Sequence, residues 1–318
     1  MFLEPQVKVD VLPAAGLTPE LTQRWAALQA ADSRYSSPYL APEFTATVAQ
    51  VRDEVQVGLL SCDGEVAGFF PFQRHAGDEG GPVGDNLCDF QAIVAAPGVR
   101  WTAADLLRGC GLRTWRFQYL LDGAEAFRPH YERTFLFTYM DLSRGYQEYV
   151  RERRETGSQL IKDTGRRRRR LEREIGPLRF EPVVTDAAVL RQLMRWKSAQ
   201  YLRTDKPDRF AVPWIVELLE RLHGLRTESF AGILSALWAG DALVAAHLGM
   251  RWRHVWHWWF PTYDRKYARY SPGVVLDLLM AESAPALGIQ RIDLGRICDH
   301  KQRLMSGAFE LAQGCARV

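Results

Sequence analysis

The first part of the chain has apolar residues at helical spacing. Leu21, Trp25 and Leu28 recur about one helical turn apart, which predicts a helix over residues 18–31. A second helix is predicted over residues 42–51. Two helices are therefore expected before the first clear strands.

Two apolar runs with a turn between them come next. Residues 55–60 and 66–72 flank Asp63 and Gly64, residue types that tolerate the positive φ of a tight hairpin turn. This pattern predicts a β-hairpin. The glycine-rich stretch at residues 77–84 is predicted to be a surface loop.

The second half repeats helices followed by strands and extends the series. A strand at 134–142 is expected to end the first half. The elements expected in the second half are one bent helix or two helices over 146–175, a strand at 178–184, helices at 186–201 and 213–223, strands at 230–238, 243–250 and 254–260, a helix from 271 to 288, a strand at 289–295, and a final helix or loop around 301–304. The series predicts an α/β (α+β) fold. The weak repetition predicts a duplication, with one domain over residues 1–145 and another over residues 146–318.

The composition is that of an ordinary globular protein. The chain has 318 residues, of which 47% are apolar and 25% charged. Its five cysteines are widely spaced and form no C-x-x-C pair, so no zinc site or other metal site is expected. No apolar run is long enough to span a membrane, and the first residues lack the pattern of a signal peptide. A cytoplasmic location is the expectation.

Positive charge is concentrated in one predicted helical segment. Residues 151–173 contain ten basic and four acidic residues, so this segment has a net charge of +6. Because the whole chain has a net charge of +3, the remaining residues sum to −3. At its centre is a run of five arginines, Arg166, Arg167, Arg168, Arg169 and Arg170. The run can be a solvated helix face or a groove for an anionic ligand. No nucleic-acid-binding motif accompanies it, so sequence-specific reading of nucleic acid is not expected.

A strand, a loop and a helix start follow one another late in the chain. The helix is predicted to begin at Ser271, Pro272 and Gly273, which suit an N-cap, a first helical position and a close backbone approach to a ligand. A helix start presents free N–H groups and the positive end of the helix dipole, which favour a pyrophosphate. An ordinary capped helix has the same residues, and both interpretations remain open on this pattern alone.

Residues from about 166 to 307 resemble the GNAT acyltransferases related to the cellulose-biosynthesis protein CelD, and more distantly the FemAB aminoacyltransferases. The resemblance rests on the arginine run leading into the strand at 178, on residues 257–264, on residues 269–273, and on Asp293-Leu294-Gly295-Arg296. A looser likeness over residues 40–72 implies a degenerate GNAT-like first half. The fold expected is therefore two tandem GNAT-like halves, each a mixed, mostly antiparallel sheet flanked by helices.

The resemblance implies acetyl-CoA as the acyl donor. Pantetheine is expected beside the strand that ends at Phe260, and the pyrophosphate at the following helix start. The residues expected to bind the donor are Phe260, Arg269, Ser271, Pro272, Gly273 and Val274. Two features depart from the family pattern: Pro272 and Val274 take positions of small residues, and His300 stands where an aromatic residue is expected.

Transfer of an acyl group to an amine needs a base for the ammonium proton. His257 and Asp264 are the first candidates by their place on the strand and loop, and Asp293 on the next strand is the third. Each also has a structural alternative, as a buried strand residue or a turn former. The expected reaction is acetylation of an amine on an amino sugar or polysaccharide precursor. The alternatives are FemAB-like aminoacyl transfer from tRNA and a non-catalytic regulator of polysaccharide export.

Overall fold

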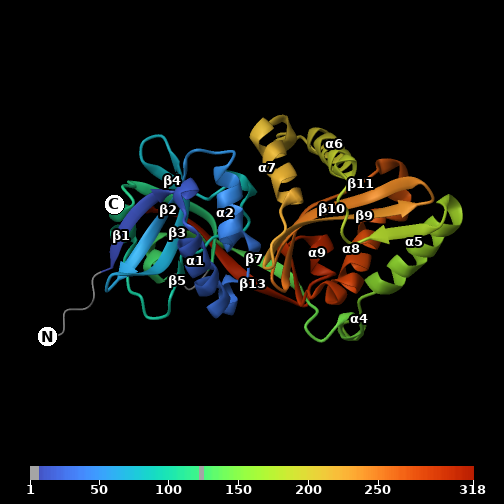
Figure 1. The fold of residues 1–318 in the computed structure, drawn as a ribbon. Helices are drawn as coiled ribbons and strands as arrows, with labels where there is room; N and C mark the ends of the chain where they lie inside the picture. Colours follow the sequence, from blue (N-terminus) through green and yellow to red (C-terminus); the bar gives the residue numbers. More distant parts are fainter. Residues whose placement is uncertain (1–6, 122–124) are drawn as a thin grey trace. The chain divides into compact units, whose positions relative to one another are not determined.

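The computed structural model describes residues 7–121 and 125–318, which form two compact units (Figure 1). The first unit extends to Leu136 and also includes Phe309–Val318, and the second unit is Phe137–Ala308. The boundaries therefore differ from the expected division after residue 145. Phe309–Val318 belongs to the first unit because its strand pairs with a strand of that unit.

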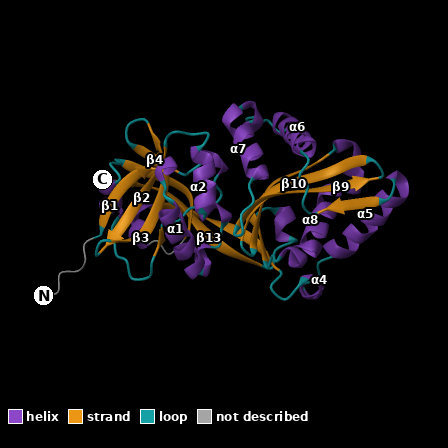
Figure 2. Ribbon diagram, in the orientation of Figure 1, coloured by secondary structure: helices purple, strands orange, loops and turns teal. Residues whose placement is uncertain are grey.

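The first unit is a mixed sheet with helices, as Figure 2 shows by secondary structure. The strand order is β1-β2-β3-β4-β6-β13, and β5 pairs with β3. The strands are β1 (Lys8–Pro13), β2 (Val55–Cys62), β3 (Glu65–His75), β4 (Glu79–Gly81), β5 (Val94–Ala95), β6 (Thr114–Leu121) and β13 (Gly307–Arg317), and the helices are α1 (Pro19–Ala31), α2 (Pro42–Ala49) and α3 (Ala103–Gly109). Buried aromatic side chains fill its core, and Trp25 of α1 stacks on Phe69 of β3 with ring centroids 5.0 Å apart.

Local sequence signals explain the first elements. Thr18 caps α1 because its Oγ1 accepts a hydrogen bond from the Leu21 N–H at 3.3 Å. Asp63 and Gly64 both have positive φ, 52° and 85°, which closes the hairpin of β2 and β3. The predicted helices and hairpin are confirmed here.

The glycine-rich stretch at residues 77–84 was expected to be a loop, and at its centre this is wrong. Strand β4 lies there and pairs with both β3 and β6. A Cβ at Gly80 would lie 2.8 Å from Leu112 Cδ1, and one at Gly81 would lie 2.7 Å from His75 Nε2. These glycines therefore allow close packing of a strand rather than flexibility of a loop.

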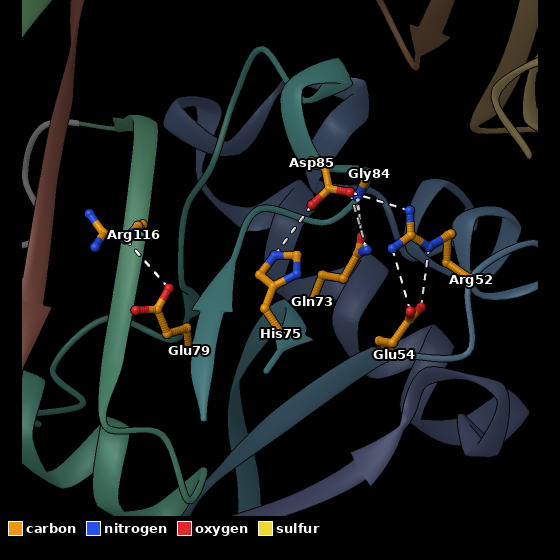
Figure 3. Close-up of polar contacts among 8 residues, drawn as sticks. All are labelled: Arg52, Glu54, Gln73, His75, Glu79, Gly84, Asp85 and Arg116. Atoms are coloured by element: carbon orange, nitrogen blue, oxygen red, sulfur yellow. Dashed lines mark hydrogen bonds and ion pairs between the residues drawn. The ribbon is translucent and has the colours of Figure 1, made fainter. Parts of the chain in front are cut away.

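A polar network holds the segment that follows β4, as Figure 3 shows. The Asp85 carboxylate accepts hydrogen bonds from Arg52 Nη1 at 3.4 Å and Gln73 Nε2 at 3.3 Å, and it lies 3.3 Å from His75 Nε2. The fully buried Gln73 also accepts a hydrogen bond from the Gly84 N–H at 3.2 Å. The chain after β4 is thus fixed by side chains of its own unit.

The second unit has the strand order β7-β12-β11-β10-β9-β8. The strands are β7 (Tyr131–Asp141), β8 (Leu178–Glu181), β9 (Phe230–Ala239), β10 (Ala242–Trp252), β11 (Val255–Tyr263) and β12 (Arg291–Arg296), and the helices are α4 (Tyr146–Glu155), α5 (Leu160–Ile175), α6 (Ala187–Arg203), α7 (Pro213–Gly224), α8 (Pro272–Ser283) and α9 (Asp299–Gln302). Two helices, not one bent helix, occupy residues 146–175, with Gly157 at φ 76° between them. The predicted fold class is confirmed.

The order of elements in the two units is the same. The series β1-α1-α2-β2-β3-β4-α3-β6 corresponds to β8-α6-α7-β9-β10-β11-α8-β12. In both series neighbouring strands pair antiparallel until the last pair, β4 with β6 or β11 with β12, which is parallel. Each series is completed by a strand from elsewhere in the chain, because β13 pairs with β6 and β7 pairs with β12.

Candidate functional site

Strands β11 and β12 separate part-way along their length. They pair in parallel at Val255 with Arg291, at Trp256 with Ile292 and at His257 with Asp293. Beyond His257, β11 continues to Tyr263, and no further pairing with β12 occurs among the residues that the structure describes. From Trp258 onward, the described part of β11 is therefore paired with β10 and not with β12.

A β-bulge lies at the point of separation. Phe260 pairs with Leu248 and Trp258 pairs with Gly249, so Trp259 is the extra residue in β11. The Trp259 N–H donates a hydrogen bond to Nε2 of the fully buried His247 at 3.2 Å. Burial lowers the pKa of His247 well below its usual value, which keeps the ring neutral and able to accept this bond. His247 thus stabilises the bulge.

Helix α8 begins with an open first turn. Ser271 occupies the predicted N-cap position in the left-handed conformation (φ 50°, ψ 55°), but its side chain caps none of the helix N–H groups. Its carbonyl oxygen instead accepts hydrogen bonds from Val274 at 3.0 Å and Val275 at 3.2 Å. No acidic residue lies in the first turn, and a Cβ at Gly273 would meet only Tyr263 Cδ1, at 3.4 Å. A left-handed non-glycine residue at such a position is typical of a functional site.

The open edge of β11 and the start of α8 line one cavity of about 360 Å³. Its walls are formed by residues from α6, β11, α8, β12 and α9. The lining residues are Lys197, Gln200, Trp258, Trp259, Pro261, Thr262, Tyr263, Ala268, Ser271, Gly273, Val274, Asp277, Leu294, His300, Lys301 and Leu304. The size and the mixture of apolar walls with a few polar groups are typical of a small-molecule site.

Lys197 of α6 contributes a half-buried amine to this cavity. Its Nζ donates a hydrogen bond to the Pro261 carbonyl oxygen at 3.0 Å. Burial, together with the nearby charges of Arg209, Lys206 and Lys301, lowers the pKa of Lys197 to about 8. Part of the lysine population is therefore neutral at slightly alkaline pH.

Asp277 and His300 form a hydrogen-bonded pair on the cavity wall. His300 Nε2 lies 2.8 Å from Asp277 Oδ2. Burial raises the pKa of Asp277, and the hydrogen bond with Asp277 raises the pKa of His300. The side chain of Asp277 is 7% exposed and that of His300 is 43% exposed, so the carboxylate is enclosed while the imidazole is accessible from the cavity.

The three predicted catalytic residues lie outside this cavity wall. His257 is buried in the sheet, and Asp293 is also buried and forms an ion pair with Arg291, with Nε 2.8 Å from Oδ1. Asp264 accepts a hydrogen bond from the Lys266 N–H at 2.9 Å and caps a short helical turn. The structure does not bring them together at the site, and their catalytic roles stay predictions.

Apart from Arg269, the predicted donor-binding residues divide into two groups. Ser271, Gly273 and Val274 line the cavity. Phe260 and Pro272 are buried in the unit. The proposed contacts of all of them with acetyl-CoA stay predictions.

Arg269 lines a second, smaller cavity together with arginines of α5. This cavity has a volume of about 260 Å³, and its walls are Asp163, Arg166, Arg167, Arg170 and Arg269. Glu174 lies at its edge, 3.0 Å from Arg170 Nε and 3.7 Å from Arg269 Nη2. Four arginines against the carboxylates of Asp163 and Glu174 leave an excess of positive charge at this cavity.

Sequence reasoning missed Lys197 and Asp277. Asp277 carried a usable signal, since it is the lone charge inside the apolar run Val274–Met280 of a buried helix. His300 was recognised only as a departure from the family pattern. Neither a metal-binding group of His, Cys, Asp or Glu nor a helix long and apolar enough to cross a membrane occurs in the described parts of the chain, residues 7–121 and 125–318.

Comparison with known proteins gives the family of this site. Residues 158–303 match the acetyltransferase (GNAT) domain family. No curated protein sequence matches the chain significantly.

Solved structures share the fold at low sequence identity. A tandem GNAT protein from the clavulanic acid biosynthesis pathway is 13% identical, with 98% of each chain covered and a TM-score of 0.53. FemX is 9% identical, with 96% of each chain covered and a TM-score of 0.56. A glucosamine N-acetyltransferase region of a fungal multi-domain β-N-acetylglucosaminidase is 9% identical over 99% of this chain and 38% of that one, with a TM-score of 0.51. Residues 158–303 therefore match the acetyltransferase (GNAT) domain family, and the solved structures share the fold.

Proposed function

We propose that the chain transfers an acetyl group from acetyl-CoA to an amine of an amino sugar or polysaccharide precursor. The observation that carries this proposal is the cavity in which the open edge of β11 meets the uncapped start of α8. An extended amide-bearing chain and an anionic group fit these two walls. Acetyl-CoA has both, in its pantetheine and its pyrophosphate.

The donor is held by backbone groups in this proposal. The pantetheine amides pair with β11 beyond His257, where the edge is open. The pyrophosphate lies at the first turn of α8 beside Gly273, where the helix dipole and the free N–H groups favour negative charge. Because Gly273 has no side chain, the phosphates can approach the backbone closely.

The arginine cavity supports the same orientation of the donor. Arg269 lies two residues before Ser271 in the chain, and α5 packs against α8. The 3′-phosphate of CoA is an anion suited to Arg166, Arg167, Arg170 and Arg269. In this proposal the anionic ligand of the arginine run is the 3′-phosphate of the donor.

The acceptor side of the cavity is aromatic. Trp258, Trp259 and Tyr263 contribute rings to its wall, and aromatic faces favour stacking with sugar rings. The likeness to a glucosamine N-acetyltransferase region adds support for an amino sugar as acceptor. D-glucosamine is therefore the first acceptor to test.

The experiment combines binding and turnover. Calorimetry should detect acetyl-CoA binding to the wild type, and release of CoA thiol should increase when D-glucosamine is added. Trp259→Ala should raise the KM for D-glucosamine about tenfold, the equivalent of about 1.4 kcal/mol of lost binding. Trp238→Ala in β9 is the matched control, since Trp238 packs against Arg179 and does not line the cavity.

Two outcomes would favour other functions. Acetyl-CoA binding without thiol release to D-glucosamine or other amines would favour a non-catalytic regulator. Binding of aminoacyl-tRNA in place of acetyl-CoA would favour FemAB-like transfer, for which the arginines of α5 and the fold shared with FemX are the supporting features.

A further inference from the structure

We propose that His300 is the general base that removes the ammonium proton of the acceptor and that the buried Asp277 is its positioning residue. The inference rests on the proposed acyl transfer and deepens it. Both side chains line the cavity that receives the two substrates. Neither residue is among the catalytic candidates suggested by the resemblance to known families.

The geometry of the pair fixes which ring nitrogen acts. His300 Nε2 lies 2.8 Å from Asp277 Oδ2, so in the neutral ring Nε2–H donates to the carboxylate. Nδ1 then carries the lone pair and is the nitrogen available to a substrate. Asp277 lies on helix α8, six residues after Ser271. The same helix therefore holds both the proposed donor site and the residue that positions His300.

Lys197 of the cavity and the candidates outside it suit this role less well. Lys197 is engaged with the Pro261 carbonyl oxygen, and with a pKa of about 8 most of it is charged at neutral pH. His257 and Asp293 are enclosed in the sheet. His300 combines an oriented ring with a side chain that is 43% exposed.

The charges around the pair set its pH behaviour. Asp277 raises the pKa of His300, whereas burial and the positive charges of Lys301 and Arg303 oppose this rise. Lys197 of α6 and Tyr263 of β11 also line the cavity, and Tyr149 of α4 lies near Asp277. The net direction is upward, so the ring is a stronger base than a free histidine and becomes protonated at a higher pH.

The reaction balances without a further reagent. Neutral His300 takes one proton from the acceptor ammonium, and the amine lone pair attacks the thioester carbonyl carbon. As the tetrahedral intermediate collapses, the C–N bond is kept and the C–S bond breaks with its electron pair going to sulfur. The nitrogen loses a second proton, which ends on the CoA thiolate. The imidazolium then returns its proton to solvent.

The test measures thiol release from acetyl-CoA against pH, with D-glucosamine and with water alone as acceptor. His300→Gln should lower kcat by about 10²–10⁴-fold while the calorimetric affinity for acetyl-CoA is retained. In the wild type the rate should fall as the pH drops through the raised pKa of His300, and this acid limb should be absent from His300→Gln. His254→Gln is the matched control, because His254 lies exposed in the β10–β11 turn outside the cavity.

The positioning role of Asp277 has its own readout. The imidazole NMR signal that disappears in His300→Gln should titrate above the usual pKa of histidine in the wild type and at lower pH in Asp277→Asn. Asp277→Asn should also shift the acid limb of kcat to lower pH. A merely structural Asp277 would change the melting temperature without moving either titration.

Failure of this inference can be told apart from failure of the proposed function. If the wild type neither binds acetyl-CoA nor releases thiol, the proposed function is wrong and the inference falls with it. If the wild type binds and reacts but His300→Gln stays within a few fold, or keeps the acid limb, His300 is not the base. An unchanged His300 titration in Asp277→Asn would overturn the positioning role.

Discussion

Helices α3 and α8 have the same place in the repeated order of elements, but their first turns differ in chemistry. In α3, Thr102 and Asp105 form a capping box, with the Asp105 N–H donating to Thr102 Oγ1 at 3.1 Å and the Thr102 N–H to Asp105 Oδ2 at 3.2 Å. In α8, Ser271 leaves the first turn uncapped and no acid is present. The comparison predicts an anion site at the open start of α8 and none at the capped start of α3.

The strands that precede these helices, β11 before α8 and β4 before α3, also differ. Strand β11 is long, has a bulge at Trp259 and separates from β12. Strand β4 is short, and the chain after it is held by the network around Asp85. The first unit thus uses its own side chains where the second unit leaves room for a ligand. This supports the hypothesis that the first half is a degenerate relative of the second.

The largest expected effect comes from placing an acid in the first turn of α8, which has none. Gly273→Asp should weaken acetyl-CoA binding more than 100-fold, since a carboxylate would replace the pyrophosphate at the helix start and repel it. Isothermal calorimetry measures this. Gly224→Asp at the end of α7 is the control, because its added Cβ meets no atom within 4 Å and it does not line the cavity. Equal affinity in both variants would place the donor elsewhere.

A smaller effect is expected at the arginine cavity beside α8. Arg269→Gln should reduce CoA affinity about tenfold, or about 1.4 kcal/mol, but leave the affinity for 3′-dephospho-CoA nearly unchanged. Arg265→Gln is the control, since Arg265 lies on the same short helical turn but outside the cavity. If the variant loses both ligands equally, Arg269 does not bind the 3′-phosphate.

The smallest effect is expected at α3 itself. Thr102→Ala removes the capping box and should lower the free energy of unfolding by about 1 kcal/mol. Thermal unfolding followed by circular dichroism measures the loss. Acetyl-CoA affinity should not change, because the open start of α8 is the proposed anion site. A clear change in affinity would contradict the view that the first unit is not part of that site.

Elements with strong local signals were predictable from the sequence. The cap at Thr18, the Asp63-Gly64 turn and the three strands of β9, β10 and β11 follow from residue types and spacing within one element. The strand at Glu79–Gly81 was not predictable in this way. Its glycines are typical of a loop, and only the close approach of neighbouring side chains explains them.

The helix start at the candidate site was predictable from the sequence, but the side-chain pair on the cavity wall was not. The helix start at Gly273 was located from Ser-Pro-Gly after a strand. The pairing of Asp277 with His300 joins residues 23 positions apart, in a helix and in a short turn, so no local pattern indicates it. His257 was chosen for its place in the sequence, but whether a strand residue faces the cavity depends on its partner strands.

The way each series of strands is completed has a consequence for how the chain is made. Because β13 follows the second unit in the chain, the edge of β6 that it pairs with stays without this partner until residues 307–317 have been translated. Domains usually fold in order from the N-terminus during synthesis, and an unpaired strand edge favours aggregation. The first unit instead depends on residues translated after the whole second unit, so termination between β6 and β13 would leave it with an exposed edge.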